Sequence, residues 1–164
     1  MHPKTINVLF VCTGNSARSI IAEGLLNALG GGRFRAFSSG SHPTGRVNPF
    51  ALEVLERNGY PTGGLRSKSW DEFARPKAPP IDFVITVCGN AAGEVCPIFP
   101  GKPVSAHWGL PDPAAVEGSD EDKRRAFRET LDVMRRRVQR FTGLPFESTD
   151  KQALKGAMAE IGAS

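Results

Sequence analysis

The residues of this chain that can support nucleophilic chemistry begin with Cys12 and Arg18. Cys12 ends an apolar run, and Arg18 follows six residues later, with small or polar residues between the two. A helix is predicted directly after this loop, and the unpaired N–H groups and macrodipole at a helix N-terminus favour an anion. Arg18 can bind a tetrahedral oxyanion through two donors, and the same field favours the nucleophilic thiolate form of Cys12. The loop therefore predicts an oxyanion site with a sulfur nucleophile.

Backbone conformation supports the same interpretation of the loop. Gly14 and Asn15 tolerate the left-handed backbone that a tight loop needs, and we expect Ser19 to hydrogen-bond the Cys12 thiolate. The predicted oxyanion-binding residues are Thr13, Gly14, Asn15, Ser16, Ala17, Arg18 and Ser19. A cysteine that closes a buried strand is often only a small hydrophobe. The combination of a strand before the loop and a helix after it favours function for Cys12.

Two further cysteines lie in the second half of the chain. Cys88 also ends an apolar run, and Cys96 follows it after a stretch rich in small residues. Thiols stay reduced in the cytoplasm, so three cysteines there indicate redox chemistry or metal binding rather than a structural framework. A three-cysteine site for a metal or metalloid is an open alternative, but the chain has no close Cys-x-x-Cys pair and we predict no metal site.

Length and composition narrow the class of protein. The 164 residues suit one domain with a proper core, and the net charge of +4 would help to attract a small oxyanion. No apolar run is long enough for a membrane span, and residues 1–7 lack the features of a signal peptide, so we expect a cytoplasmic protein. The basic run Arg135–Arg137 lies on a predicted helix that also carries acids, which indicates a solvated face. We expect neither nucleic-acid nor membrane partners.

Strand and helix patterns alternate along the chain. Strands are predicted over 7–11, 33–38, 81–88 and 103–108, and helices over 19–29, 49–58, 69–73, 120–141 and 149–161. This alternation predicts an α/β fold with a parallel sheet and helices on both faces. Binding sites in such sheets lie beyond the carboxyl ends of the strands. Cys12 and Cys88 lie at two such ends, and Asp112 lies shortly after a third.

The stretch Cys12–Ser19, with the sequence CTGNSARS, resembles the phosphate-binding loop of the low-molecular-weight protein tyrosine phosphatases. It is even more similar to the arsenate reductases that share their fold. The resemblance implies a four-stranded parallel sheet of the phosphotyrosine protein phosphatase I type over residues 1–142. Residues 143–164 are then a C-terminal tail with an extra helix. The resemblance also implies that Asp112, which precedes Pro113, is the general acid; by itself, Asp-Pro is common turn chemistry.

The segments around Cys88 and Cys96, and the stretch His107–Asp112, resemble the thioredoxin-coupled arsenate reductases. A reductase needs a second thiol to release arsenite and form a disulfide, whereas a phosphatase needs only one thiolate. Phosphatases of this fold usually follow the Asp-Pro pair with tyrosines, where this chain has Ala114 and Ala115. The resemblance thus implies an arsenate reductase of arsenic detoxification that uses Cys12 and a Cys88/Cys96 relay. It implies thioredoxin or glutaredoxin as electron donor, no cofactor, and residual phosphatase activity.

Other functions stay open at this point. One is a phosphatase that hydrolyses phosphate esters through a phosphocysteine at Cys12, and another is a non-catalytic anion sensor. Ala17 stands where some reductases have a further cysteine, and the gap from Cys88 to Cys96 is one residue longer than in the best-known members, a difference that loop-closure entropy tolerates. Some members bind potassium through residues equivalent to Asn15, Glu23 and Ser38. The aspartate of that site has no clear match near Trp70, so potassium binding, the electron donor and the oligomeric state stay open.

Overall fold

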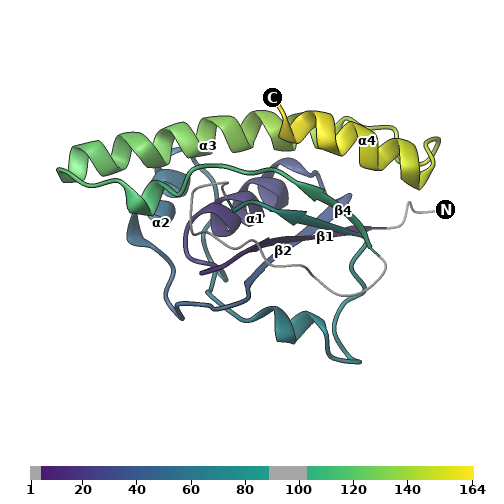
Figure 1. Ribbon diagram of the computed structural model, residues 1–164, viewed down its shortest axis with the longest axis horizontal. Helices are drawn as coiled ribbons and strands as arrows, with labels where there is room; N and C mark the ends of the chain where they lie inside the picture. Colours follow the sequence, from purple (N-terminus) through teal and green to yellow (C-terminus); the bar gives the residue numbers. More distant parts are fainter. Residues whose placement is uncertain (1–4, 89–102) are drawn as a thin grey trace.

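The structure, a computed structural model, describes residues 5–88 and 103–164. At its centre is a four-stranded sheet in the order β2-β1-β3-β4, and every pairing is parallel. The predicted four-stranded parallel sheet is therefore confirmed (Figure 1). Its strands are β1 (Ile6–Cys12), β2 (Phe34–Gly40), β3 (Phe83–Thr86) and β4 (Val104–His107). Because the strands are parallel, their carboxyl ends meet at one edge of the sheet.

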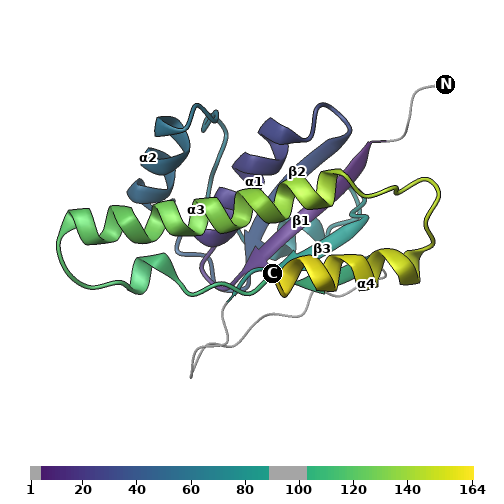
Figure 2. The ribbon, with the colours of Figure 1, turned by 90° about the horizontal axis from the view of Figure 1, so that it is seen from above.

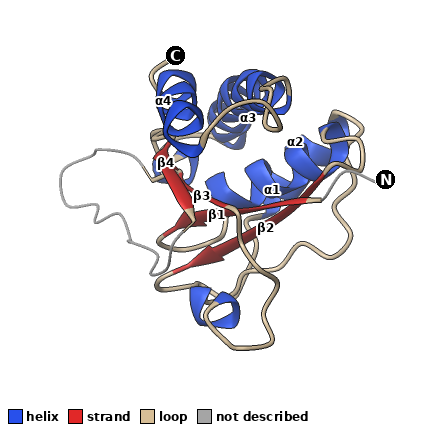
Figure 3. Ribbon diagram, turned by 90° about the vertical axis from the view of Figure 1, so that its right-hand side faces the viewer, coloured by secondary structure: helices blue, strands red, loops and turns tan. Residues whose placement is uncertain are grey.

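The two faces of the sheet are covered unequally. The four α-helices lie together on one face (Figures 2 and 3), and the 3₁₀-helix η1 (Trp70–Phe73) lies on the other (Figure 3). Alternate residues of β1 serve the two faces. Val8 and Phe10 join the larger core under the α-helices, whereas Leu9 and Val11 pack with Trp70 and the other side chains of the second face. The four consecutive residues from Val8 to Val11 are fully buried, two on each face of the sheet. A strand that is covered on both faces needs apolar side chains at every position, which explains the continuous apolar run.

The α-helices are α1 (Arg18–Leu29), α2 (Pro49–Arg57), α3 (Asp120–Thr142) and α4 (Lys151–Gly162). Three of them begin at a polar side chain that accepts a backbone N–H: Asn48 before α2, Ser119 before α3 and Asp150 before α4. Helix α1 follows Ala17 and has no side-chain cap. Its first N–H groups lie at the loop after Cys12, where an anion could take the place of a cap.

Helix α3 packs through the apolar stripe that its sequence predicts. Its members Phe127, Leu131, Met134, Val138 and Phe141 are all buried. Helix α4 adds Leu154, Met158 and Ile161 to the same core, so the C-terminal tail packs on the body of the fold. The indole N–H of Trp108 donates to the carbonyl oxygen of Met158 at 2.9 Å. Among the described residues, no helix is long and apolar enough to cross a membrane.

Two strands end two residues away from their predicted ends at the carboxyl edge, and the other two strands end one residue away. Strand β2 continues to Gly40, two residues beyond the prediction, because Gly40 pairs with Cys12. Strand β3 ends at Thr86 rather than at Cys88. The N–H of Val87 still donates to the carbonyl oxygen of Val11, and β1 ends one residue later. Cys88 thus lies just beyond the sheet, in the loop region.

Candidate active site

Cys12 is the last residue of β1 and lies at the base of the loop that leads to α1. Only 3% of it is exposed. The backbone N–H of Asn15 donates to Cys12 Sγ at 3.2 Å, and Ser19 Oγ lies 3.0 Å from the same sulfur. Both contacts hold the sulfur at the base of the loop. The sulfur also faces the uncapped start of α1, the positive end of its macrodipole.

The side chain of Asn15 gives these hydrogen bonds a direction. Asn15 is fully buried and adopts a left-handed backbone with φ of 46°. Its Oδ1 accepts the N–H of Lys68 at 2.9 Å, so its Nδ2 must be the group that donates to Ser19 Oγ at 2.8 Å. Ser19 then has its own proton left to donate to Cys12 Sγ. Asn15 and Ser19 thus form a short hydrogen-bonded chain that ends at Cys12 Sγ.

The outer side of the loop is held by the segment that follows β2. Four loop carbonyls accept backbone N–H groups from it: those of Cys12, Thr13, Gly14 and Ser16, from Ser41, His42, Thr44 and Asn48 respectively. A carbonyl oxygen would repel an oxyanion, and this pairing keeps the four oxygens occupied outside the loop. The close approach requires glycine at position 40, where a β-carbon would collide with the carbonyl oxygen of Thr13.

Arg18 and Asp112 meet at the open side of the loop. Arg18 is 5% exposed and its Nη1 donates to the carbonyl oxygen of Leu110 at 3.0 Å. Its Nη2 lies 3.8 Å from Asp112 Oδ2. The other carboxylate oxygen of Asp112 accepts the N–H of Ala114 at 3.0 Å, which is ordinary turn chemistry. Asp112 thus uses one oxygen in the turn and presents the other to the loop, an arrangement compatible with the predicted general acid.

The structure describes only one of the two predicted relay cysteines, Cys88. Cys88 is fully buried and is disulfide-bonded, whereas Cys12 is a free cysteine. A β-carbon at Gly109 would lie 3.0 Å from the carbonyl oxygen of Cys88, so Cys88 adjoins the loop that carries Asp112. Cys96 lies outside the described residues.

Sequence reasoning missed a buried ion pair behind the loop. Lys68 Nζ lies 3.7 Å from Glu23 Oε1, and the hydroxyl of Ser38 donates to the same carboxylate oxygen. Burial raises the pKa of Glu23 and lowers the pKa of Lys68, and the attraction between the two groups opposes both shifts. A lone lysine between Ser67 and Ser69 carries no sequence signal that it is buried, since lysine is usually exposed.

These residues do not fit the potassium site of some members of the resembled family, which the sequence left open for this chain. The cation that faces the Glu23 carboxylate is the Lys68 ammonium, and the amide oxygen of Asn15 is taken by a backbone N–H.

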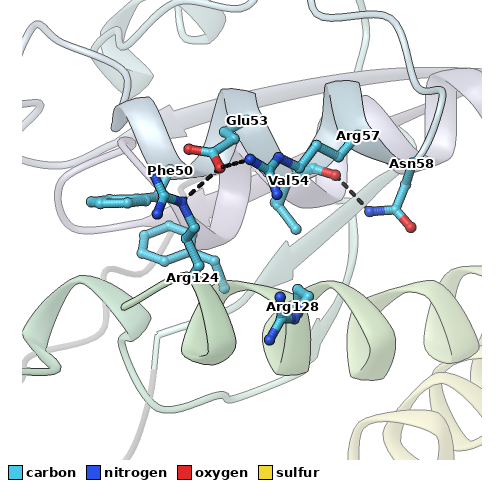
Figure 4. Close-up of a pocket in the computed structure, with 8 residues that line it drawn as sticks. Phe50, Glu53, Val54, Arg57, Asn58, Arg124 and Arg128 are labelled. Carbon is cyan, nitrogen blue, oxygen red and sulfur yellow. Dashed lines mark hydrogen bonds and ion pairs between the residues drawn. The ribbon is translucent and has the colours of Figure 1, made fainter. Parts of the chain in front are cut away.

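A pocket lies between α2 and α3, away from the Cys12 loop (Figure 4). Its arginines are engaged by acids: Glu53 Oε1 lies 2.8 Å from Arg124 Nε and 3.1 Å from Arg57 Nη2. Arg128, which lines the same pocket, lies 3.7 Å from Glu121. Because these charges are paired with one another and no nucleophile lines the pocket, we assign it to the packing of the two helices.

Comparison with known proteins places this geometry in context. Residues 7–155 match the family described as low molecular weight phosphotyrosine protein phosphatase. An arsenate reductase of Halalkalibacterium halodurans is 38% identical over 134 residues, which cover 82% of this chain and 93% of the relative. The crystal structure of arsenate reductase from Archaeoglobus fulgidus superposes with a TM-score of 0.68 at 27% identity, over 84% of this chain and 99% of that one. The thioredoxin-dependent arsenate reductase of Corynebacterium glutamicum gives a TM-score of 0.55 at 27% identity, over 85% of this chain and 64% of that one.

Proposed function

Because the chain belongs to the low-molecular-weight phosphotyrosine protein phosphatase family, in which its relatives include arsenate reductases, we propose that it reduces arsenate to arsenite. The observation that carries this proposal is the placement of two cysteines at one edge of the sheet. The N–H of Val87 donates to the carbonyl oxygen of Val11 at 3.0 Å, so the next residues, Cys88 and Cys12, leave neighbouring strands together. A phosphatase of this fold has no use for the second thiol.

The first step uses Cys12, the loop and Asp112. Arsenate binds between the loop N–H groups and the guanidinium of Arg18, and the Cys12 thiolate attacks arsenic. Asp112 protonates the departing oxygen, which leaves as water. The product is a covalent adduct in which Cys12 Sγ is bonded to arsenic(V). The hydrogen bonds from Asn15 and Ser19 hold the sulfur in place before the attack.

The second step transfers two electrons. The Cys88 thiolate attacks Cys12 Sγ, and the electron pair of the sulfur–arsenic bond moves to arsenic, which leaves as arsenite. A Cys12–Cys88 disulfide forms. The Cys96 thiolate then attacks Cys88 and releases Cys12, and an external dithiol such as thioredoxin or glutaredoxin reduces the Cys88–Cys96 bond.

The proposed setting is the cytoplasm, where reduced thioredoxin and glutaredoxin are available and the reaction would serve arsenic detoxification. The relative from Corynebacterium glutamicum is described as thioredoxin-dependent, which supports thioredoxin as the donor.

The test is arsenate-dependent oxidation of NADPH in the presence of thioredoxin and thioredoxin reductase, repeated with glutaredoxin, glutathione and glutathione reductase. We expect turnover with at least one donor and none with the Cys88→Ser protein. Hydrolysis of p-nitrophenyl phosphate is measured in parallel, since the loop and Asp112 also suit a phosphate ester. Turnover of the ester without any arsenate reduction would replace the reductase with a phosphatase.

A further inference from the structure

The Lys68–Glu23 ion pair joins three parts of the fold behind the Cys12 loop. Glu23 belongs to α1, Ser38 to β2, and Lys68 to the segment before η1. The side chains of Lys68 and Glu23 are only 7% and 12% exposed. The Lys68 ammonium also donates to the carbonyl oxygen of Arg66 at 2.9 Å. A buried carboxylate without a counter-charge is costly, so each partner of this pair depends on the other.

The same lysine is connected to the nucleophile through Asn15. The backbone N–H of Lys68 donates to Asn15 Oδ1, and its carbonyl oxygen accepts the N–H of Gly40 at 2.9 Å. Asn15 donates to Ser19 Oγ, which in turn lies against Cys12 Sγ. The position of the Lys68 backbone therefore sets the orientation of the Asn15 amide, and the amide orients the Ser19 hydroxyl.

The neighbouring serine strengthens this connection. Ser67 Oγ lies 3.2 Å from the carbonyl oxygen of Gly14, to which it donates, and it accepts the N–H of Gly45 at 3.1 Å. The segment Ser67–Lys68 thus contacts two consecutive residues of the loop, Gly14 and Asn15. Two contacts anchor this segment to the body of the fold: the Lys68 carbonyl oxygen accepts the N–H of Gly40 on β2, and the Lys68 side chain reaches Glu23 on α1.

We propose that the Lys68 ammonium is the resident cation of the Glu23 carboxylate, and that it acts as a positioning residue for the Cys12 loop, which therefore needs no free monovalent cation. A potassium ion would have to compete with an ammonium that is attached to the chain and already faces the carboxylate. The inference rests on the proposed function only in that the loop must bind an oxyanion. It differs from the potassium site of some family members, in which a free cation takes this place.

The experiment measures two properties that need no reductase activity. One is the Kd for inorganic phosphate, by calorimetry, and the other is the rate of Cys12 alkylation by iodoacetamide, mapped by mass spectrometry. Both are measured in potassium chloride and in choline chloride at equal ionic strength, because choline is too large to enter the Glu23 site. We expect the wild-type protein to give the same values in the two salts.

The variants separate charge from packing. In choline chloride, Lys68→Ala should weaken phosphate binding by about tenfold, as for other coupled polar networks. Potassium should restore part of this loss, because the shortened side chain leaves room beside Glu23. The double variant Lys68→Ala/Glu23→Gln should bind phosphate equally well in potassium chloride and in choline chloride. The control Lys77→Ala, at an exposed lysine nearby, should behave as the wild-type protein does.

Several results would overturn the proposal. Phosphate binding by the wild-type protein that tightens several-fold in potassium would show that a free cation is needed, and this result requires no variant. Unchanged phosphate binding in Lys68→Ala, or a loss that potassium does not restore, would show that the ammonium is not the cation that matters. If Lys68→Ala does not fold, the double variant Glu23→Gln/Lys68→Met, which removes both charges, is measured in its place. Weakened phosphate binding by this variant supports the proposal, and unchanged phosphate binding contradicts it. Absence of arsenate reduction is a separate result that bears on the proposed function alone.

Discussion

Arg18 Nη2 lies 3.8 Å from Asp112 Oδ2, so the proposed oxyanion ligand and the proposed general acid face each other across the loop. Arg18 Nη1 donates to the carbonyl oxygen of Leu110, which lies two residues before Asp112. An oxyanion bound by Arg18 would therefore lie next to the carboxyl that protonates its departing oxygen. The Asp112 side chain is 39% exposed, so the ion pair adds little to stability and its value is in this placement.

Asp112→Asn should slow the first chemical step by about a hundredfold or more while phosphate affinity changes much less. The amide keeps the acceptor that holds the N–H of Ala114, so the turn is preserved. Single-turnover formation of the arsenate adduct, together with phosphate calorimetry, separates the two effects. A change confined to affinity would make Asp112 a turn residue only.

Arg18→Lys should weaken phosphate binding by about tenfold or more, since the lysine keeps the charge but loses the planar fork and the hydrogen bond to Leu110. Calorimetry with inorganic phosphate measures the change. Arg46→Lys, at an exposed arginine of the outer segment, is the matched control and should leave the affinity unchanged. Near-normal binding by Arg18→Lys would show that charge alone suffices.

The cysteine relay predicts a graded set of intermediates. Cys12→Ser should abolish both arsenate reduction and any phosphatase activity. Cys96→Ser should allow one turnover and trap a Cys12–Cys88 disulfide, whereas Cys88→Ser should stop at the arsenate adduct. Both of these variants should keep whatever phosphatase activity the protein has.

Mass mapping of disulfides after a single arsenate turnover decides this prediction. The wild-type protein should show a Cys88–Cys96 bond. If that bond does not form, and the Cys88 and Cys96 variants both turn over normally with thioredoxin, the relay is wrong.

Gly40→Ala should destabilise the fold by about 1–3 kcal/mol, because the added methyl group would overlap the carbonyl oxygen of Thr13 and crowd Asn15. Urea unfolding gives the change in the free energy of unfolding. Gly63→Ala is the matched control, since a β-carbon at position 63 meets no atom within 4 Å. Equal stability of the two variants would mean that the loop moves away from β2 at no cost.

The local parts of the site could be predicted from the sequence because their signals lie within a few residues. The apolar run that ends at Cys12, the small residues after it and the helix that follows predict the strand, loop and helix in their observed order. The apolar spacing from Phe127 to Phe141 likewise predicts the buried face of α3. Hydrophobic period and capping chemistry act over one or two turns, so they can be recognised in a linear sequence.

The contacts that join distant segments depended on the tertiary structure. The hydrogen bond from Lys68 to Asn15 spans 53 residues, and that from Arg18 to Leu110 spans 92. Each depends on strand register and on how loops leave the sheet, and neither the side chain of Lys68 nor its neighbours indicate the partner. The burial of Lys68 follows from the packing of α1, β2 and the segment before η1 together. The proposed nucleophile could therefore be predicted from the sequence, whereas the ion pair behind it became evident only when the chain was folded, because a buried charge is defined by its surroundings rather than by its type.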